Sequence, residues 1–140
     1  MTAPDIVRSA YAELVVTDLA RSRWFWVDML GMVVQHEEAD ALYLRGFDEL
    51  THHSLVLRRG ETPAADRLAF RVRRPEDLDR AEAFFAARGC PVKRFPAGTT
   101  PGVGRASAPK TRWASWSSSS TRSSRSSGCT SATTCATARR

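Results

Sequence analysis

The hydrophobic and polar positions near the N-terminus follow a strand pattern first and a helix pattern next. Residues 9–16 end in an apolar run, as strands commonly do. Thr17 and Asp18 follow, with side-chain oxygens that can accept hydrogen bonds from the first free N–H groups of a helix. Over residues 19–30 the apolar positions recur at helical spacing, which predicts one buried face: Ser22, Phe25, Trp26, Met29 and Leu30. Gly31 then stands where a left-handed residue ends a helix.

Short apolar segments separated by polar turns follow this helix. They predict strands over residues 32–36, 41–47 and 51–59. Leu42 and Leu44 alternate with other residues in the second strand, and Leu55 and Leu57 do so in the third. The first part of the chain therefore has the order β-α-β-β-β.

The same order begins again in the second half of the chain. Residues 67–73 predict a strand, and Pro75 opens a helix over residues 75–88 that Gly89 ends. The apolar stripe of this helix is Leu78, Ala81, Phe84 and Phe85, continued by Arg88. Residues 91–95 predict a strand, and residues 96–104 form a loop rich in Gly, Pro and Thr. The repeat predicts an α+β fold of two paired β-α-β-β-β modules, about 8–60 and 65–106, the second lacking its last two strands.

The composition changes abruptly after this point. Residues 111–140 contain 16 Ser or Thr and no Leu, Ile, Val, Phe or Met. Such a segment cannot bury enough apolar surface to offset a chain entropy of about 1–2 kcal/mol per residue. We therefore expect residues 1–106 to form the domain and residues 107–140 to be a disordered, low-complexity tail.

One interpretation of the tail is a natural low-complexity segment. The other, which we favour, is translation out of frame, because the change occurs where core strands are required. With the third codon bases chosen for the purpose, residues 112–118 read Leu-Gly-Phe-Leu-Val-Glu when the frame moves by two bases. That reading is an alternating apolar strand ending in a carboxylate.

The net charge of +6 belongs to the tail, since residues 104–140 hold seven basic residues and no acidic one. Residues 1–103 carry 14 basic against 15 acidic residues, so no nucleic-acid partner is expected for the folded part. No run approaches the roughly 20 apolar residues of a membrane span, and the first residues lack a secretory signal, so we expect a cytoplasmic protein. The spacing of Cys90, Cys129 and Cys135 supports neither a disulfide framework nor a zinc site.

The segment AYAELVVTDLARSRWFWVDMLGMVV resembles the opening strand and helix of the vicinal oxygen chelate superfamily, which includes glyoxalase I, bleomycin-resistance proteins and extradiol dioxygenases. The segments APDIVRSAYAELVVTDLARSR, LYLRGFDELTHHSLVL, LAFRVRRPEDLDRAEAFFAARGC and GVGRA are similar to the N-terminal domains of homoprotocatechuate (3,4-dihydroxyphenylacetate) 2,3-dioxygenases. This resemblance runs from about Ala3 to Ala106.

The resemblance implies a parent subunit of two domains that cleaves catechols with O₂ and Fe(II) or Mn(II). Two His and one Glu of the C-terminal domain hold that metal, in an arrangement that leaves positions open for the substrates. This chain would then be the non-catalytic N-terminal domain, with no cofactor of its own. Its partners would be the catalytic domain and further copies of the subunit, with no nucleic acid or membrane. Two alternatives remain: a small dimeric ligand-binding protein of the bleomycin-resistance kind, and a glyoxalase-like metalloenzyme.

The resemblance also locates the positions that carry metal ligands in other members. The first-strand position seven residues before Asp18 is Tyr11, where ligand-bearing members have His. The corresponding position of the second module falls at about Arg67, and a guanidinium stays protonated and does not ligate metals. We therefore assign no catalytic, cofactor-binding or metal-binding residue to this chain.

His52 and His53 are the remaining candidates for a metal pair. Neighbours on a regular strand point to opposite faces, so we expect one half-buried and one solvated side chain rather than a shared metal. Structural roles are also expected for the other conspicuous groups. We expect His36, Glu37 and Glu38 to form a solvated strand end, and Trp24, Phe25 and Trp26 to be core and domain-contact surface. Cys90 is expected to be inert. A solvated helix face is expected to carry Glu76, Asp77, Asp79 and Glu82.

Overall fold

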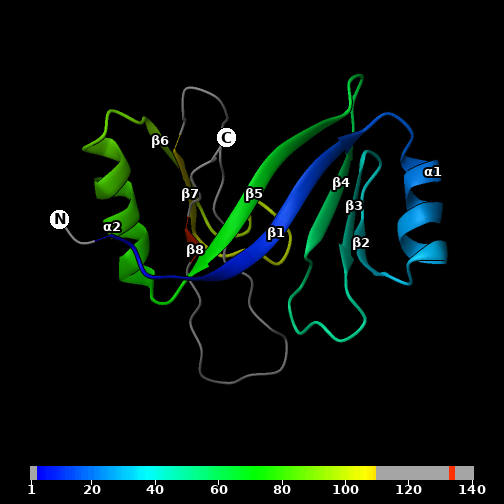
Figure 1. Ribbon diagram of the computed structural model, residues 1–140, viewed down its shortest axis with the longest axis horizontal. Helices are drawn as coiled ribbons and strands as arrows, with labels where there is room; N and C mark the ends of the chain where they lie inside the picture. The colour runs from blue at the N-terminus through cyan, green and yellow to red at the C-terminus, as the bar shows by residue number, and fades with distance from the viewer. Residues whose placement is uncertain (1–2, 110–132, 135–140) are drawn as a thin grey trace.

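The computed structural model describes residues 3–109 and the backbone of residues 133–134. It contains a six-stranded sheet with the order β2-β3-β4-β1-β5-β8 and a two-stranded sheet of β6 and β7 (Figure 1). The predicted α+β class is confirmed. The elements are β1 (Ile6–Val16), α1 (Leu19–Arg23), the π-helix η1 (Trp24–Met29), β2 (Val33–Glu37), β3 (Ala41–Arg45), β4 (Leu55–Arg59), β5 (Ala64–Val72), α2 (Pro75–Ala86), β6 (Val92–Phe95), β7 (Ala106–Pro109) and β8 (Thr133–Thr134).

The first module runs from β1 to β4. β4 lies parallel to β1, while β3 is antiparallel to both β4 and β2. Alternate leucines of β3 and β4 form one core with Leu19 of α1: Leu42, Leu44, Leu55 and Leu57. This core lies between the sheet and the helical segment α1–η1, which Figure 1 shows at one end of the molecule.

The helix of this module begins and ends as predicted. Asp18 is its N-cap, and a carboxylate oxygen accepts a hydrogen bond from the Arg21 backbone N–H at 2.9 Å. Gly31 has a φ of 74°, in the left-handed region that suits glycine.

The predicted buried face of this helix is wrong at Phe25, Met29 and Leu30, which are exposed, and is confirmed at Trp26. Residues Trp24–Met29 form a π-helix, in which the Leu30 N–H donates to the Phe25 carbonyl five positions earlier at 3.1 Å. In this wider turn residues four or five apart, rather than three or four apart, lie on the same side of the helix. Trp26 and Val27 therefore pack against the core, whereas Phe25 and Met29 are 46% and 61% exposed.

The strand predicted over residues 51–59 begins only at Leu55. The residues between β3 and Leu55 form a loop, which the side chains of Arg45 and Glu49 stabilise through hydrogen bonds. The Arg45 guanidinium donates to the Glu49 carbonyl, and the Glu49 carboxylate accepts from the Gly46 N–H at 2.6 Å. These local hydrogen bonds offer the backbone an alternative to the sheet ladder.

The second module begins with β5, which is antiparallel to β1. α2 follows, and β6 and β7 then pair with Phe95 opposite Ala106 and Val92 opposite Pro109. The expectation that both last strands are lacking is wrong, because β7 is one of them. It extends the described fold to Pro109, three residues beyond the boundary predicted at Ala106. β8 pairs with Phe70 and Arg71. The disorder predicted for the rest of residues 107–140 falls outside the described residues.

The acidic residues of α2 do not form one solvated face as predicted. Asp77 is 2% exposed. Its carboxylate accepts hydrogen bonds from the Arg74 N–H at 3.1 Å and from the Arg80 guanidinium at 2.9 Å, which offset the cost of burying it. Glu82 is bonded to the Arg94 guanidinium of β6 at 2.6 Å. The expected apolar stripe is buried at Leu78, Ala81 and Phe85. Phe84 is half-buried, and Arg88 is exposed and stacks on its ring.

Candidate functional site

The face of the main sheet opposite α1 carries Tyr11 and Arg67, the two positions singled out in the sequence. We call it the inner face, and it consists of alternate residues of the central strands: Tyr11, Glu13, Tyr43, Val56, Arg58, Arg67 and Ala69. The loop over residues 96–104 covers this face. Tyr11, Arg67 and Val103 help to enclose a cavity of only about 40 Å³ between the loop and the strands. The inner face is therefore largely filled by the protein itself.

Glu13 lies at the centre of the inner face and is 3% exposed. One carboxylate oxygen is 2.7 Å from Nε of Arg58, and the other is 3.2 Å from Nε of Arg67. A carboxylate out of reach of water needs such partners, since burying it alone is costly. Glu13 and the two arginines thus form one buried ion triad that joins β1, β4 and β5.

The carboxylate keeps both arginines charged. The hydrogen bond from Arg58 to Glu13 raises the pKa of Arg58 above its usual value and outweighs the effect of burial. For Arg67, burial alone would lower the pKa, but the charge of Glu13 and the neighbouring Asp66 raise it overall. Neither guanidinium can lose its proton and become a metal ligand.

The register between β1 and β5 relates the two modules. Tyr11 pairs with Ala69, and Glu13 pairs with Arg67. Tyr11 and Arg67 therefore lie on the same inner face, on neighbouring strands and offset by two residues in the register.

His53 is the most deeply buried titratable group next to this face, with no exposed surface. Its ring lies 4.7 Å from that of Tyr11 and 5.3 Å from that of Tyr43, and Nε2 is buried without a hydrogen-bond partner. Burial, with a smaller effect of His52, lowers the pKa of His53 to about 3. The side chain is therefore a neutral imidazole within an aromatic cluster.

The argument that strand geometry separates His52 from His53 is wrong, because both precede β4 and lie in the loop. Their Nδ1 atoms are 3.0 Å apart, a hydrogen-bond distance. If Nδ1 of His53 carries the proton and donates to His52, Nε2 of His53 is left with a buried lone pair. In the opposite tautomer Nε2 would carry the proton, and a buried N–H would lack an acceptor. We assign the first tautomer for this reason. His52 also contacts the second module, since a Cβ on Gly102 would lie 2.2 Å from its ring.

The other candidates lie apart from the inner face. His36 contacts Glu38 at 3.5 Å at the surface, and Cys90 is half-buried after α2. The part of the chain that the structure describes holds no group of three or more His, Cys, Asp or Glu arranged to bind a metal.

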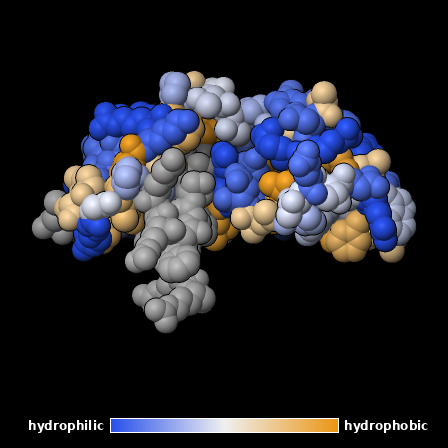
Figure 2. Space-filling model, turned by 90° about the horizontal axis from the view of Figure 1, so that it is seen from above, coloured by the Kyte–Doolittle hydropathy of each residue, from blue (hydrophilic) through white to orange (hydrophobic). Residues whose placement is uncertain are grey.

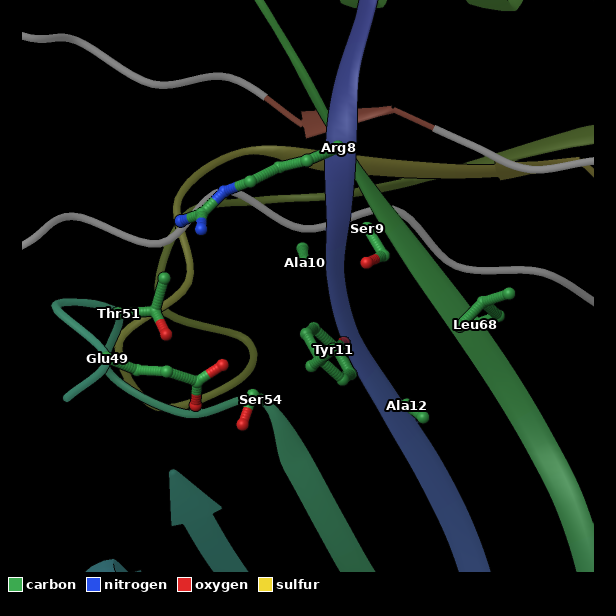
Figure 3. A pocket seen from close by; sticks show the side chains of 9 residues that line it. All are labelled: Arg8, Ser9, Ala10, Tyr11, Ala12, Glu49, Thr51, Ser54 and Leu68. Carbon is green, nitrogen blue, oxygen red and sulfur yellow. The ribbon is translucent and has the colours of Figure 1, made fainter. Parts of the chain in front are cut away.

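A larger cavity of about 260 Å³ opens beside the N-terminal half of β1 (Figure 3). Figure 3 shows Arg8 extending over it toward Thr51, with Glu49 and Ser54 on the side of the loop. Glu49 also accepts from the Gly46 N–H. Arg8 and Glu49 are therefore the charged groups in the lining of this cavity, and Arg8 is its one cation.

The residues and fold can now be compared with known proteins. The family model described as "Glyoxalase/Bleomycin resistance protein/Dioxygenase superfamily" matches residues 8–113. The chain belongs to this superfamily. Among solved structures, variants of homoprotocatechuate 2,3-dioxygenase from Brevibacterium fuscum are similar, with a TM-score of 0.79 and 47% identity over 85% of this chain.

Two curated relatives are also dioxygenases. Manganese-dependent 2,3-dihydroxybiphenyl 1,2-dioxygenase of Geobacillus genomosp. 3 is 31% identical over 76% of this chain, and metapyrocatechase of Pseudomonas sp. (strain CF600) is 29% identical over 71%. The chain spans about a third of the length of these relatives, 33% in each case. Another similar structure is described as an extradiol ring-cleaving dioxygenase.

The residues on the inner face do not fit the divalent metal that such enzymes use. Tyr11 and Arg67 stand at the two matched strand positions, and the one nearby carboxylate, Glu13, has both oxygens engaged by guanidinium groups. A metal ion placed there would compete with two fixed positive charges for that carboxylate. We therefore derive no chemical step through a metal on this face.

The ion triad was not predicted from the sequence. Its signal is weak: Glu13 in the apolar run of residues 12–16, Arg58 near the end of one later strand, and Arg67 in another. Only the pairing of β1 with both β4 and β5 brings these charges together.

Proposed function

We propose that this chain is the N-terminal, non-catalytic domain of an extradiol dioxygenase that acts on catechols of the 3,4-dihydroxyphenylacetate type. Its own role is structural: it packs against the catalytic domain and takes part in assembling subunits. The domain comprises residues 1–109 with modules 8–60 and 65–109, since β7 ends at Pro109, and an out-of-frame tail follows it. The parent enzyme is cytoplasmic, uses Fe(II) or Mn(II), and contacts neither nucleic acid nor membrane.

The observation that carries this proposal is the composition of the inner face. The positions that could hold a metal carry Tyr11 and Arg67, and Glu13 is committed to Arg58 and Arg67. The similarity to dioxygenases three times as long supports a role as one part of such an enzyme. Among the described residues, no helix is long and apolar enough to cross a membrane.

The test is a metal and activity assay on the purified full chain. We expect no stoichiometric uptake of Fe(II) or Mn(II) and no ring-cleavage product from 3,4-dihydroxyphenylacetate, with a homoprotocatechuate 2,3-dioxygenase as the positive control. Stoichiometric metal that is lost in His52→Ala or His53→Ala, together with ring-cleavage product, would overturn the proposal.

A separate test addresses the tail at the level of DNA. The gene read in all frames beyond codon 106 should encode a strand ending in Glu near codon 118, followed by a domain with a His-His-Glu ligand set. If no frame encodes these elements, the out-of-frame origin of the tail is wrong. The inner-face argument does not depend on this result.

A second candidate function, small-ligand binding, is favoured by the cavity beside β1. Arg8, the one cation in its lining, can pair with a small carboxylate, while the Glu49 carboxylate in the same lining opposes a second negative charge. Titration with 3,4-dihydroxyphenylacetate and with uncharged catechol, followed by calorimetry, tests it. Saturable binding of the acid alone, lost in Arg8→Gln, would support this function over a purely structural one.

A further inference from the structure

The π-helix η1 and the residue that follows it expose four large apolar side chains. Trp24, Phe25, Met29 and Leu30 are 54%, 46%, 61% and 56% exposed. We call these four residues the η1 surface. Figure 2 shows apolar side chains at the surface at the end of the molecule that carries α1 and η1. A soluble protein rarely leaves several such side chains uncovered within one short segment.

The π-turn explains why these residues share one surface. Residues four or five apart lie on the same side of such a helix, so Trp24 precedes Met29, and Phe25 precedes Leu30, by about one turn. Of the three residues between these pairs, Trp26 and Val27 pack against the core of the first module, and Asp28 is exposed. The wider turn thus divides the apolar residues into an inward pair and an outward four.

The size of the η1 surface suits a contact between proteins. With side chains of this size, the exposed fractions amount to roughly 450 Å² of surface, near the upper range for a monomer. Two copies facing each other would bury about 900 Å² from these residues alone. The flanking charged side chains would bring the total close to the roughly 1,200 Å² at the lower end of stable interfaces.

The charges beside the η1 surface are complementary to those of a second copy. Arg23 precedes the surface and Asp28 lies near its end, both exposed. Among the described residues, neither forms a side-chain ion pair. In an antiparallel pair of helices about a two-fold axis, Arg23 of each copy would face Asp28 of the other.

We propose that a second copy of this chain docks on the η1 surface, with the two helical segments antiparallel about a two-fold axis. This interface rests on the subunit-assembly part of the proposed function and identifies the surface that serves it. The alternative occupant is a further domain of the same chain. The second copy is favoured because β6 and β7, the last strands before residue 110, lie toward the α2 end of the molecule, away from α1 (Figure 1).

The first test compares two identical substitutions in the full chain by sedimentation velocity across a concentration series. The wild-type chain should form a concentration-dependent dimer, and Phe25→Glu should raise its dissociation constant by about tenfold or more. Phe47→Glu is the matched control, since Phe47 is 85% exposed but lies in the loop between β3 and β4. Equal weakening by both substitutions would overturn the proposal, because it would indicate non-specific apolar association.

The second test exchanges the charges. Arg23→Glu and Asp28→Arg should each weaken the dimer several-fold, and the double variant should restore it, because each swapped side chain again faces an opposite charge. A double variant weaker than either single one would overturn the two-fold arrangement. A chain that stays monomeric at every concentration would overturn the interface itself. That result would leave the domain assignment standing, since the metal and ring-cleavage assays test it separately.

Discussion

Replacing Glu13 by Gln tests whether the ion triad holds the three central strands together. Glu13 is 3% exposed, while the side chains of Arg58 and Arg67 are 36% and 30% exposed. Glutamine keeps the shape of the side chain but removes its charge, which leaves Asp66 as the remaining carboxylate partner of Arg67 and the more distant Asp40 as that of Arg58. Breaking a fully buried pair costs about 3–5 kcal/mol. Because both arginines reach water in part, we expect about 2–3 kcal/mol here.

For a domain of this size, such a loss lowers the melting temperature by about 10–20 °C. Urea unfolding followed by circular dichroism measures the free energy directly. Glu61→Gln is the matched control, since Glu61 is exposed and should change stability by less than about 0.5 kcal/mol. Combining Glu13→Gln with Arg58→Gln should cost less than the sum of the two single losses, because the second substitution removes one of the two charges that have lost Glu13.

Two results would contradict this reasoning. The first is that Glu13→Gln unfolds at the same urea concentration as Glu61→Gln, which would mean that the carboxylate contributes no net stability. The second is that the losses in the double variant add, which would mean that Glu13 and Arg58 are not coupled.

Three further predictions follow from the same region. The folded-state pKa of His53 is about 3, below the unfolded value near 6.5. Its contribution to the free energy of unfolding is therefore present above pH 6.5 and is lost as the pH falls toward 3. The free energy of unfolding should fall by about 2 kcal/mol between pH 7 and pH 5, and a His53→Gln variant with the same pH dependence would refute this origin. Gly102→Ala should destabilise the protein by about 1–3 kcal/mol more than Gly98→Ala. Both glycines have positive φ, but only at Gly102 would the new Cβ meet the His52 ring. Equal losses of stability would disprove this contact. Tyr11→His combined with Arg67→His should bind Mn(II) or Ni(II) more tightly than the wild-type chain in calorimetric titrations. The variant places two imidazoles near the one Glu13 oxygen that Arg67 no longer engages, and unchanged affinity would count against these as metal positions.

The sequence by itself determined the local elements of this protein. Asp18 caps the first helix and Gly31 ends it, because capping and left-handed φ depend on one or two residues and their immediate neighbours. The repeated strand–helix–strand order and the alternation in β3, β4 and β5 likewise predicted the two modules and their α+β class.

Tertiary structure decided the remaining features, which depend on contacts between distant parts of the chain. The buried charge of Glu13 is tolerated only because β4 and β5 bring Arg58 and Arg67 to either side of β1. A π-turn at Trp24–Met29 is favoured when the widened helix lets Trp26 and Val27 reach the core, and a spacing rule based on 3.6 residues per turn cannot anticipate it. β7 has the weakly strand-forming sequence Ala-Ser-Ala-Pro, and it becomes a strand because β6 supplies a hydrogen-bonding edge and α2 packs beside it.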